Sequence, residues 1–227
     1  FWRPIAEILS ADYRIIMFDQ RNAGATKFDG DFTLADVARD ASRLLHKLAI
    51  KQVVAIGHAW GGRVAQVFAR DYPEHMQAMI VCGTGGQLPA LDMREVQDEL
   101  SRALKAGDRE LWGACIAKMF CADGFTKDHP AEHEDIVELM WTHKPNRNAI
   151  WNMGVIPSNE YWGLCTHPTL LIYGEEDKNG TPENADDLHK RIKQSKLEII
   201  KGAGHFAIRE KEREVLETIR AFLSSLS

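Results

Sequence analysis

Apolar and polar positions along the 227 residues follow two alternating periods. Short, mostly apolar runs, typical of buried strands, lie at 13–18, 53–56, 79–82, 169–173 and 197–200. Between these runs apolar residues recur every three or four positions, which predicts amphipathic helices at 2–10, 33–48, 63–70, 181–193 and 210–223. Strands that alternate with helices predict an α/β fold with a doubly wound, mostly parallel sheet.

One long interval, residues 87–167, breaks this alternation because helical patterns dominate it. We therefore predict that residues 1–86 and 168–227 form an α/β core and that 87–167 form an inserted helical cap. The aromatic side chains of the cap either line an apolar pocket or join the cap to the sheet, and both alternatives stay open at this point. The candidates for binding a substrate are Trp112, Phe120, Trp141, Trp151 and Trp162.

The composition narrows the class of protein only slightly. A net charge of −5 with both signs mixed along the chain argues against a nucleic-acid partner. We expect no membrane span, because no apolar run approaches the roughly 20 residues of a membrane helix. The four cysteines form no Cys-x-x-Cys pair, which favours a reduced, cytoplasmic protein. No cofactor or metal is expected, because His129 and His133 have Pro130 between them and no evident third ligand.

The stretch from Gly57 to Gly62 carries the strongest chemical signal. It reads Gly-His-Ala-Trp-Gly-Gly and joins a predicted strand to a predicted helix, which is the pattern of a nucleophile elbow. We expect glycine at Gly57 and Gly61 because a Cβ there would crowd the strand and the helix. The Gly-x-x-x-Gly spacing places the nucleophile at Ala59, whose methyl group cannot form a covalent intermediate.

Two later loops complete a resemblance to the α/β-hydrolase superfamily, which extends over essentially the whole chain. One loop reads Tyr-Gly-Glu-Glu-Asp-Lys-Asn-Gly-Thr-Pro over 173–182, and the other reads Gly-Ala-Gly-His-Phe over 202–206. The resemblance implies that Ala59 stands at the nucleophile position, that Asp177 is the acid and that His205 is the base.

The loop at 173–182 contains two further acids besides Asp177. Glu175 and Glu176 carry the same chemistry as Asp177, but the distances along the chain from Gly174 and to Pro182 favour Asp177.

Around the elbow, the backbone N–H of Trp60 is the expected oxyanion donor. His58 is expected to point away from position 59, into the scaffold. The resemblance further implies an additional strand and loop upstream of Phe1, lying between the strands at 14–18 and 53–57.

Three functions remain in competition. The first is a serine hydrolase that cleaves an ester, lactone or related acyl bond of a small apolar or aromatic substrate, seen here in an inactive form with Ala59. The second is an epoxide or haloalkane hydrolase whose aspartate nucleophile is replaced by alanine. The third is a non-catalytic member that binds a ligand. Retention of Asp177 and His205 favours the first, and the sequence leaves the oligomeric state open.

Overall fold

The computed structural model describes residues 1–86, 88, 92–143 and 158–226. Their four strands pair in parallel in the order β1 (Val53–His58), β2 (Met76–Cys82), β3 (Thr169–Gly174) and β4 (Ser195–Ile200). In the centre of the sheet Ile56 pairs with Ile80, and Val81 pairs with Leu171. The predicted α/β fold with a parallel sheet is therefore confirmed, and four of the five predicted strands are present.

The fifth predicted strand, at 13–18, is wrong. Residues 14–20 have no regular secondary structure, and Met17 and Phe18 are 56% and 45% exposed. In the described part of the sheet β1 is an edge strand, with β2 as its one neighbour. A strand is stabilised by hydrogen bonds to an adjacent strand, and the 13–18 segment has no such partner in the described sheet.

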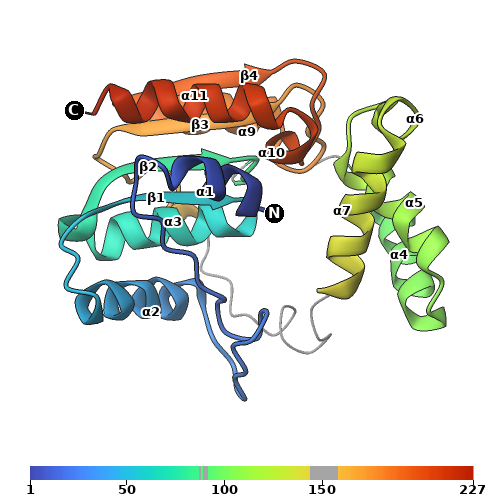
Figure 1. The fold of residues 1–227 in the computed structure, drawn as a ribbon, viewed down its shortest axis with the longest axis horizontal. Coiled ribbons are helices and arrows are strands. Elements are labelled where there is room, and N and C mark those ends of the chain that lie inside the picture. Colours follow the sequence, from blue (N-terminus) through green and yellow to red (C-terminus); the bar gives the residue numbers. More distant parts are fainter. Residues whose placement is uncertain (87, 89–91, 144–157, 227) are drawn as a thin grey trace.

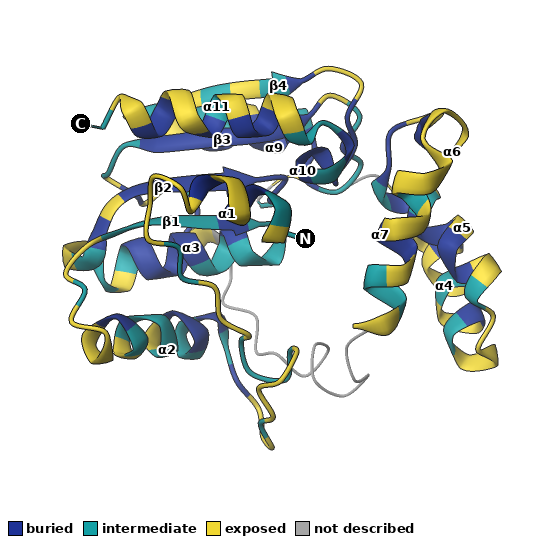
Figure 2. Cartoon of the chain, viewed as in Figure 1, coloured by how far each residue is buried: buried dark blue, intermediate teal, exposed yellow. Residues whose placement is uncertain are grey.

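Helices cover both faces of the sheet, as Figures 1 and 2 show. One face carries α2 (Leu34–Lys47), α3 (Trp60–Asp71) and α9 (Pro182–Arg191). The other face carries α1 (Arg3–Leu9), α10 (Ala207–Glu210) and α11 (Glu212–Ser224). A short 3₁₀ turn, Pro73–His75, joins α3 to β2.

The side chains of β2 alternate between these two helical layers. Met79 and Val81 pack toward α2, α3 and α9, whereas Ile80 and Cys82 pack toward α1 and α11. This alternation is the expected result of the two-residue period of a strand that is covered on both faces.

Threonine side chains cap the first turns of two helices. The Thr33 side chain accepts the Asp36 N–H, and the Asp36 carboxylate accepts the Thr33 N–H at 2.8 Å, which closes a capping box on α2. The Thr181 side chain accepts the Asn184 N–H at the start of α9. The predicted closing helix is interrupted at Lys211, where α10 ends and α11 begins.

The remaining helices come from the interval predicted to be a cap, and Figure 1 shows them grouped on one side of the sheet. The 3₁₀ turn Ser158–Glu160 comes from the same interval but lies outside this group, since the Glu160 carbonyl accepts from Arg70 of α3. The group consists of the helices α4 (Arg94–Ala106), α5 (Arg109–Phe120), α6 (Phe125–Asp128) and α7 (Pro130–Thr142). They share an apolar cluster that includes Trp112, Ile116 and Ile136. Tyr161 and Trp162, by contrast, pack in the sheet core with α3, so the chain rejoins the core before residue 168.

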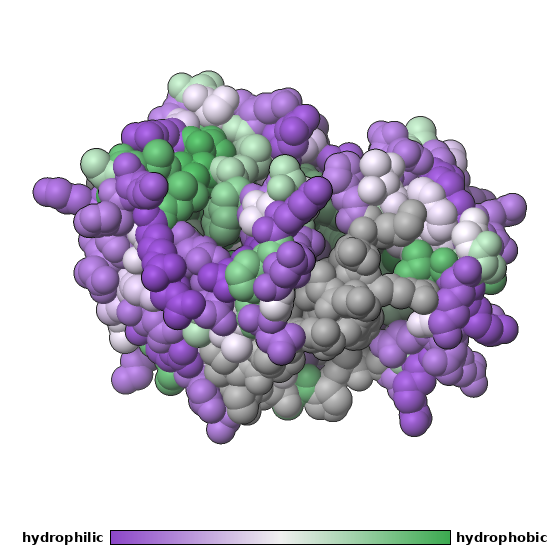
Figure 3. All heavy atoms as spheres, turned by 90° about the horizontal axis from the view of Figure 1, so that it is seen from below, coloured by the Kyte–Doolittle hydropathy of each residue, from purple (hydrophilic) through white to green (hydrophobic). Residues whose placement is uncertain are grey.

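Among the residues that the structure describes, no helix combines the length and apolar character that crossing a bilayer requires. On the face drawn in Figure 3 the coloured residues are mostly hydrophilic, with the broadest apolar area at the upper left and smaller ones near the centre and on the right. All four cysteines are buried and free, and Cys82 is a small core residue.

Candidate active site

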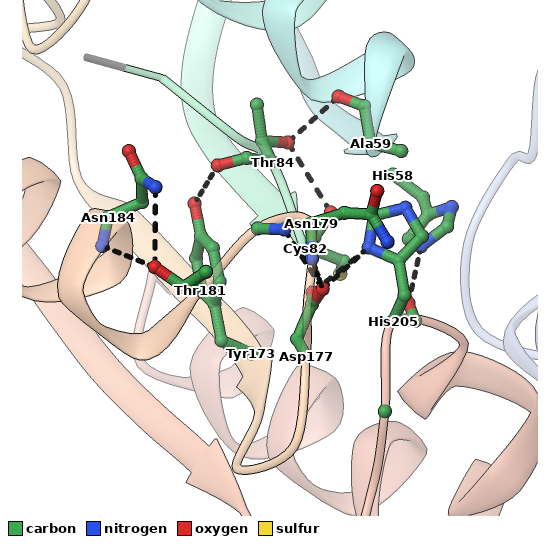
Figure 4. A network of polar contacts seen from close by, with 12 residues as sticks. His58, Ala59, Cys82, Thr84, Tyr173, Asp177, Asn179, Thr181, Asn184 and His205 are labelled. Carbon is green, nitrogen blue, oxygen red and sulfur yellow. Dashed lines mark hydrogen bonds and ion pairs between the residues drawn. The ribbon is translucent and has the colours of Figure 1, made fainter. Parts of the chain in front are cut away.

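The turn between β1 and α3 places Ala59 in strained backbone. Its φ is +50° and its ψ is −114°, a conformation that residues with a Cβ rarely adopt. The Ala59 N–H donates to the Cys82 carbonyl at 2.8 Å, and the Ala59 carbonyl accepts from Thr84 Oγ1 at 3.0 Å (Figure 4). The end of β2 therefore holds the corner from both sides, and the predicted strand–turn–helix is present.

The glycines of this turn differ in why they are needed. A Cβ on Gly57 would lie 2.2 Å from the Gly61 carbonyl oxygen, so the prediction for Gly57 is confirmed. A Cβ on Gly61 would meet nothing within 4 Å, so the prediction for Gly61 is wrong. The crowded partner is Gly62, where a Cβ would lie 2.0 Å from Thr84 Oγ1. Gly62 faces β2, whereas Gly61 faces open space.

Asp177 and His205 meet at the carboxyl ends of β3 and β4. Both carboxylate oxygens of Asp177 lie 3.0 Å from His205 Nδ1. One of them also accepts the N–H groups of Asn179 and Gly180, at 2.8 and 2.9 Å. The two residues are 3% and 7% exposed. A carboxylate held in this way keeps the proton on Nδ1 and leaves Nε2 free to accept one.

We call residues 175–181 the acid loop. Its two other acids, Glu175 and Glu176, bind backbone groups away from His205. Glu175 accepts the Gly202 N–H at 3.1 Å, and Glu176 accepts the Asp123 N–H at 2.7 Å. Of the three carboxylates in this loop, Asp177 is the one that contacts His205.

The elbow and the Asp177–His205 pair are neighbours because the end of β2 passes between them. Gly83 has a φ of +54°, and a Cβ there would lie 3.0 Å from Asp177 Oδ2 and 3.3 Å from His205 Nδ1. The residues on either side of Gly83 are Cys82 and Thr84, which bind the Ala59 backbone. Figure 4 shows the three predicted positions around this strand end.

We call residues 201–206 the histidine loop. His58 holds this loop by a hydrogen bond from its side chain. Its Nε2 donates to the His205 carbonyl at 2.7 Å, and the two rings are 4.7 Å apart. Burial, and then the nearby charge of His205, lower the pKa of His58 to about 3. His58 is therefore a neutral hydrogen-bond donor to the histidine loop. The sequence did not indicate this contact with the His205 carbonyl.

Trp60 is the first residue of α3, and the first N–H groups of a helix have no acceptor within the helix. Its indole packs against the core cluster beside α3. The Trp60 N–H therefore lies next to position 59 at the positive end of a helix, an end that favours negative charge.

The predicted substrate-binding aromatic residues occupy different places. The Phe120 ring lies 5.5 Å from the His205 ring, whereas Trp112 and Trp141 pack against each other at 5.4 Å within the apolar cluster of α4, α5, α6 and α7. Trp162 is buried in the core, where its indole N–H donates to a carboxylate of α9 at 2.7 Å. Trp151 lies outside the described residues. Of the four described residues, Phe120 is the one placed against the histidine.

Two supporting residues escaped the sequence reasoning. Thr84 holds the Ala59 carbonyl, and its own carbonyl accepts from the Tyr173 hydroxyl at 2.9 Å. Glu210 accepts the Gly204 N–H beside His205 at 3.1 Å. Only their positions along the chain could have indicated these two residues. Thr84 follows a predicted strand, and Glu210 follows His205 by five residues. Within the described chain no cluster of three His, Cys, Asp or Glu residues could hold a metal ion.

Comparison with known proteins places this geometry in a family. The sequence profile described as "alpha/beta hydrolase fold" matches residues 1–212, and the chain belongs to this family. A Cronobacter sakazakii protein provisionally named carbamate hydrolase RutD is 32% identical over 210 residues, covering 90% of this chain and 78% of that protein.

Two solved structures share the fold. A thermophilic esterase from Thermogutta terrifontis has a TM-score of 0.84 at 24% identity, covering 99% of this chain and 85% of that chain. The enol-lactonase from Burkholderia xenovorans LB400 has a TM-score of 0.82 at 17% identity, covering 98% and 85%.

Proposed function

We propose that this chain is a scaffold for hydrolysis of an ester, lactone or related acyl bond, with alanine in place of the serine nucleophile. The observation that carries the proposal is the buried Asp177–His205 pair beside the strained corner at Ala59. Burying a carboxylate beside an imidazole is costly unless both are hydrogen-bonded, and a pocket that merely binds an apolar ligand does not need such a pair.

The chemistry follows from the positions of these groups. A serine hydroxyl at position 59 would attack the acyl carbon while His205 Nε2 takes its proton and Asp177 stabilises the imidazolium. The same proton would then pass to the leaving alcohol, and water would cleave the acyl intermediate by the reverse route. The Trp60 N–H would stabilise the oxyanion. With Ala59 the first bond cannot form, so the site would hold a substrate without cleaving it.

The substrate class rests on the aromatic surroundings of His205. The Phe120 and Phe206 rings lie 5.5 and 5.7 Å from the His205 ring, which favours a small apolar or aromatic acyl group. The name of the Cronobacter relative points to a carbamate, whose scissile bond also lies at an acyl carbon.

The alternative of an aspartate nucleophile is less well supported. An epoxide hydrolase needs two phenol groups that polarise the ring oxygen, and the interval 87–167 contains one tyrosine, Tyr161. Its side chain is 1% exposed and packs in the sheet core with α3, not beside His205.

The test is the Ala59→Ser variant assayed on short p-nitrophenyl esters. We expect hydrolysis to rise at least about 100-fold above the parent chain, because the nucleophile contributes most of the rate in such triads. A second substitution, His205→Ala, should return the rate to that of the parent. If folded Ala59→Ser stays at background while Ala59→Asp turns over epoxides or haloalkanes, the second alternative replaces this proposal. If neither variant is active, the site is a binding site.

A further inference from the structure

The end of α5 is attached to both loops that carry the candidate catalytic pair. We define the α5 end as residues 118–123. The last carbonyl groups of a helix have no partner within the helix. Here the carbonyls of residues 118–120 accept, in order, from Lys178 Nζ at 3.4 Å, Asn179 Nδ2 at 2.8 Å and the His205 N–H at 2.8 Å. Two donors come from the acid loop and one from the histidine itself.

The N–H groups that follow are bound by carboxylates. Ala122 donates to Glu210 Oε2 at 2.9 Å, and Asp123 donates to Glu176 Oε2 at 2.7 Å. Five backbone groups of the α5 end are thus paired with the acid loop, with His205 or with the end of α10. The segment fixes both loops relative to the helices that follow β2.

Glu210 makes the connection closest to the imidazole. The same oxygen that binds Ala122 also accepts the Gly204 N–H, one residue before His205, and Glu210 is 8% exposed. A Cβ on Gly204 would lie 2.5 Å from the Ala122 nitrogen, so the two backbones are in direct contact. One carboxylate oxygen therefore joins the α5 end to the histidine loop at their closest approach.

We propose that Glu210 is a positioning residue that fixes His205 against Asp177 by joining Gly204 to Ala122. The proposal rests on the function proposed above, since it concerns the same pair. Glu210 does not contact the reacting atoms. It acts because a general base works only when its ring is held within about half an ångström of the productive geometry. Loss of the shared acceptor frees two buried N–H groups and lets the histidine loop move away from Asp177.

The experiment follows the His205 Nδ1 proton by NMR in the parent chain, where no turnover is required. The resonance is assigned by its loss in His205→Gln. In Glu210→Ala we expect this proton to exchange with water at least about 10-fold faster, because the loop opens more often. Glu210→Gln keeps an acceptor oxygen and should restore slow exchange. The control is Glu214→Ala, an exposed residue on α11 that should leave the exchange unchanged.

Unchanged exchange in a folded Glu210→Ala protein would overturn the proposal. If that variant does not fold, Glu210→Asp serves instead, because its shorter side chain withdraws the shared oxygen from the Gly204 and Ala122 N–H groups and keeps the carboxylate. Faster exchange than in the parent is expected there too, and identical exchange would again overturn the proposal. In the Ala59→Ser background, Glu210→Ala should lower kcat about 10-fold or more with KM nearly unchanged. An inactive Ala59→Ser protein would reject the hydrolase function but leave the exchange result standing.

Discussion

At the scale of single residues, the notable feature is that the backbone keeps a costly shape around an unreactive side chain. Ala59 has positive φ, and such conformations cost about 1–3 kcal/mol each for a residue with a Cβ. The hydrogen bonds that the Ala59 N–H donates to the Cys82 carbonyl and that the Ala59 carbonyl accepts from Thr84 hold that shape regardless of the side chain. A strained backbone of this kind is typical of the nucleophile position in a strand–turn–helix elbow. An ordinary turn between a strand and a helix does not need it.

His58 offers a test at the same scale, because its protonation is linked to folding. Its pKa is about 3 in the folded chain against 6.5 as the ordinary value. As the pH falls through 6.5 the unfolded chain takes up this proton first, so stability is lost progressively down to about pH 3. The loss should approach about 1.4 kcal/mol per pH unit.

Removing this group should flatten the pH dependence. In His58→Gln the side-chain amide can still donate to the His205 carbonyl, but it does not titrate. We expect the free energy of unfolding, measured in urea between pH 7 and pH 4, to fall less steeply than in the parent. Equal slopes for the two proteins would show that His58 is not buried as a neutral ring.

At the scale of elements, the elbow depends on how closely the start of α3 approaches β2. The two tight contacts are Gly57 against the Gly61 carbonyl and Gly62 against Thr84. They let the helix begin directly over the strand end, so that the Ala59 corner lies against Cys82 and Thr84.

Alanine at each of the three glycines separates crowding from simple helix preference. Gly57→Ala and Gly62→Ala should each destabilise the fold by about 2–3 kcal/mol or more, as overpacking does in a tight core. Gly61→Ala should be neutral or stabilise by up to about 1 kcal/mol, since its Cβ meets open space in a helix. Chemical denaturation of the three variants is the measurement. A Gly61→Ala protein as unstable as Gly62→Ala would contradict this packing.

At the scale of the whole molecule, sequence patterns predicted the elements well where local signals decide them. The run 53–56 and the run 13–18 are similar in apolar character, yet within the described residues only the first pairs with a neighbouring strand. Pairing depends on residues distant in sequence, so composition cannot separate the two. Trp162 shows the same limit, because its aromatic character says nothing about whether the chain has already returned to the core.

Some residues of the candidate site could likewise be predicted from the sequence, and others could not. Ala59, Asp177 and His205 are recognisable because each follows a strand in a loop with a particular order of residues. The contacts of Glu210 and Thr84 arise from chain segments that meet only after folding, so no local pattern marks them. The division into core and cap and the roles of the site residues therefore stay predictions that need experiment.

The most direct measurement is the mass of the Ala59→Ser protein after exposure to a fluorophosphonate, which phosphonylates activated serine hydroxyls. The account predicts one adduct, mapped to position 59, forming quickly in this variant, far more slowly when His205→Ala is added, and not at all in the parent chain. A folded Ala59→Ser protein that stays unmodified, or that is modified equally fast without His205, would contradict the claim that these three positions form a hydrolytic centre.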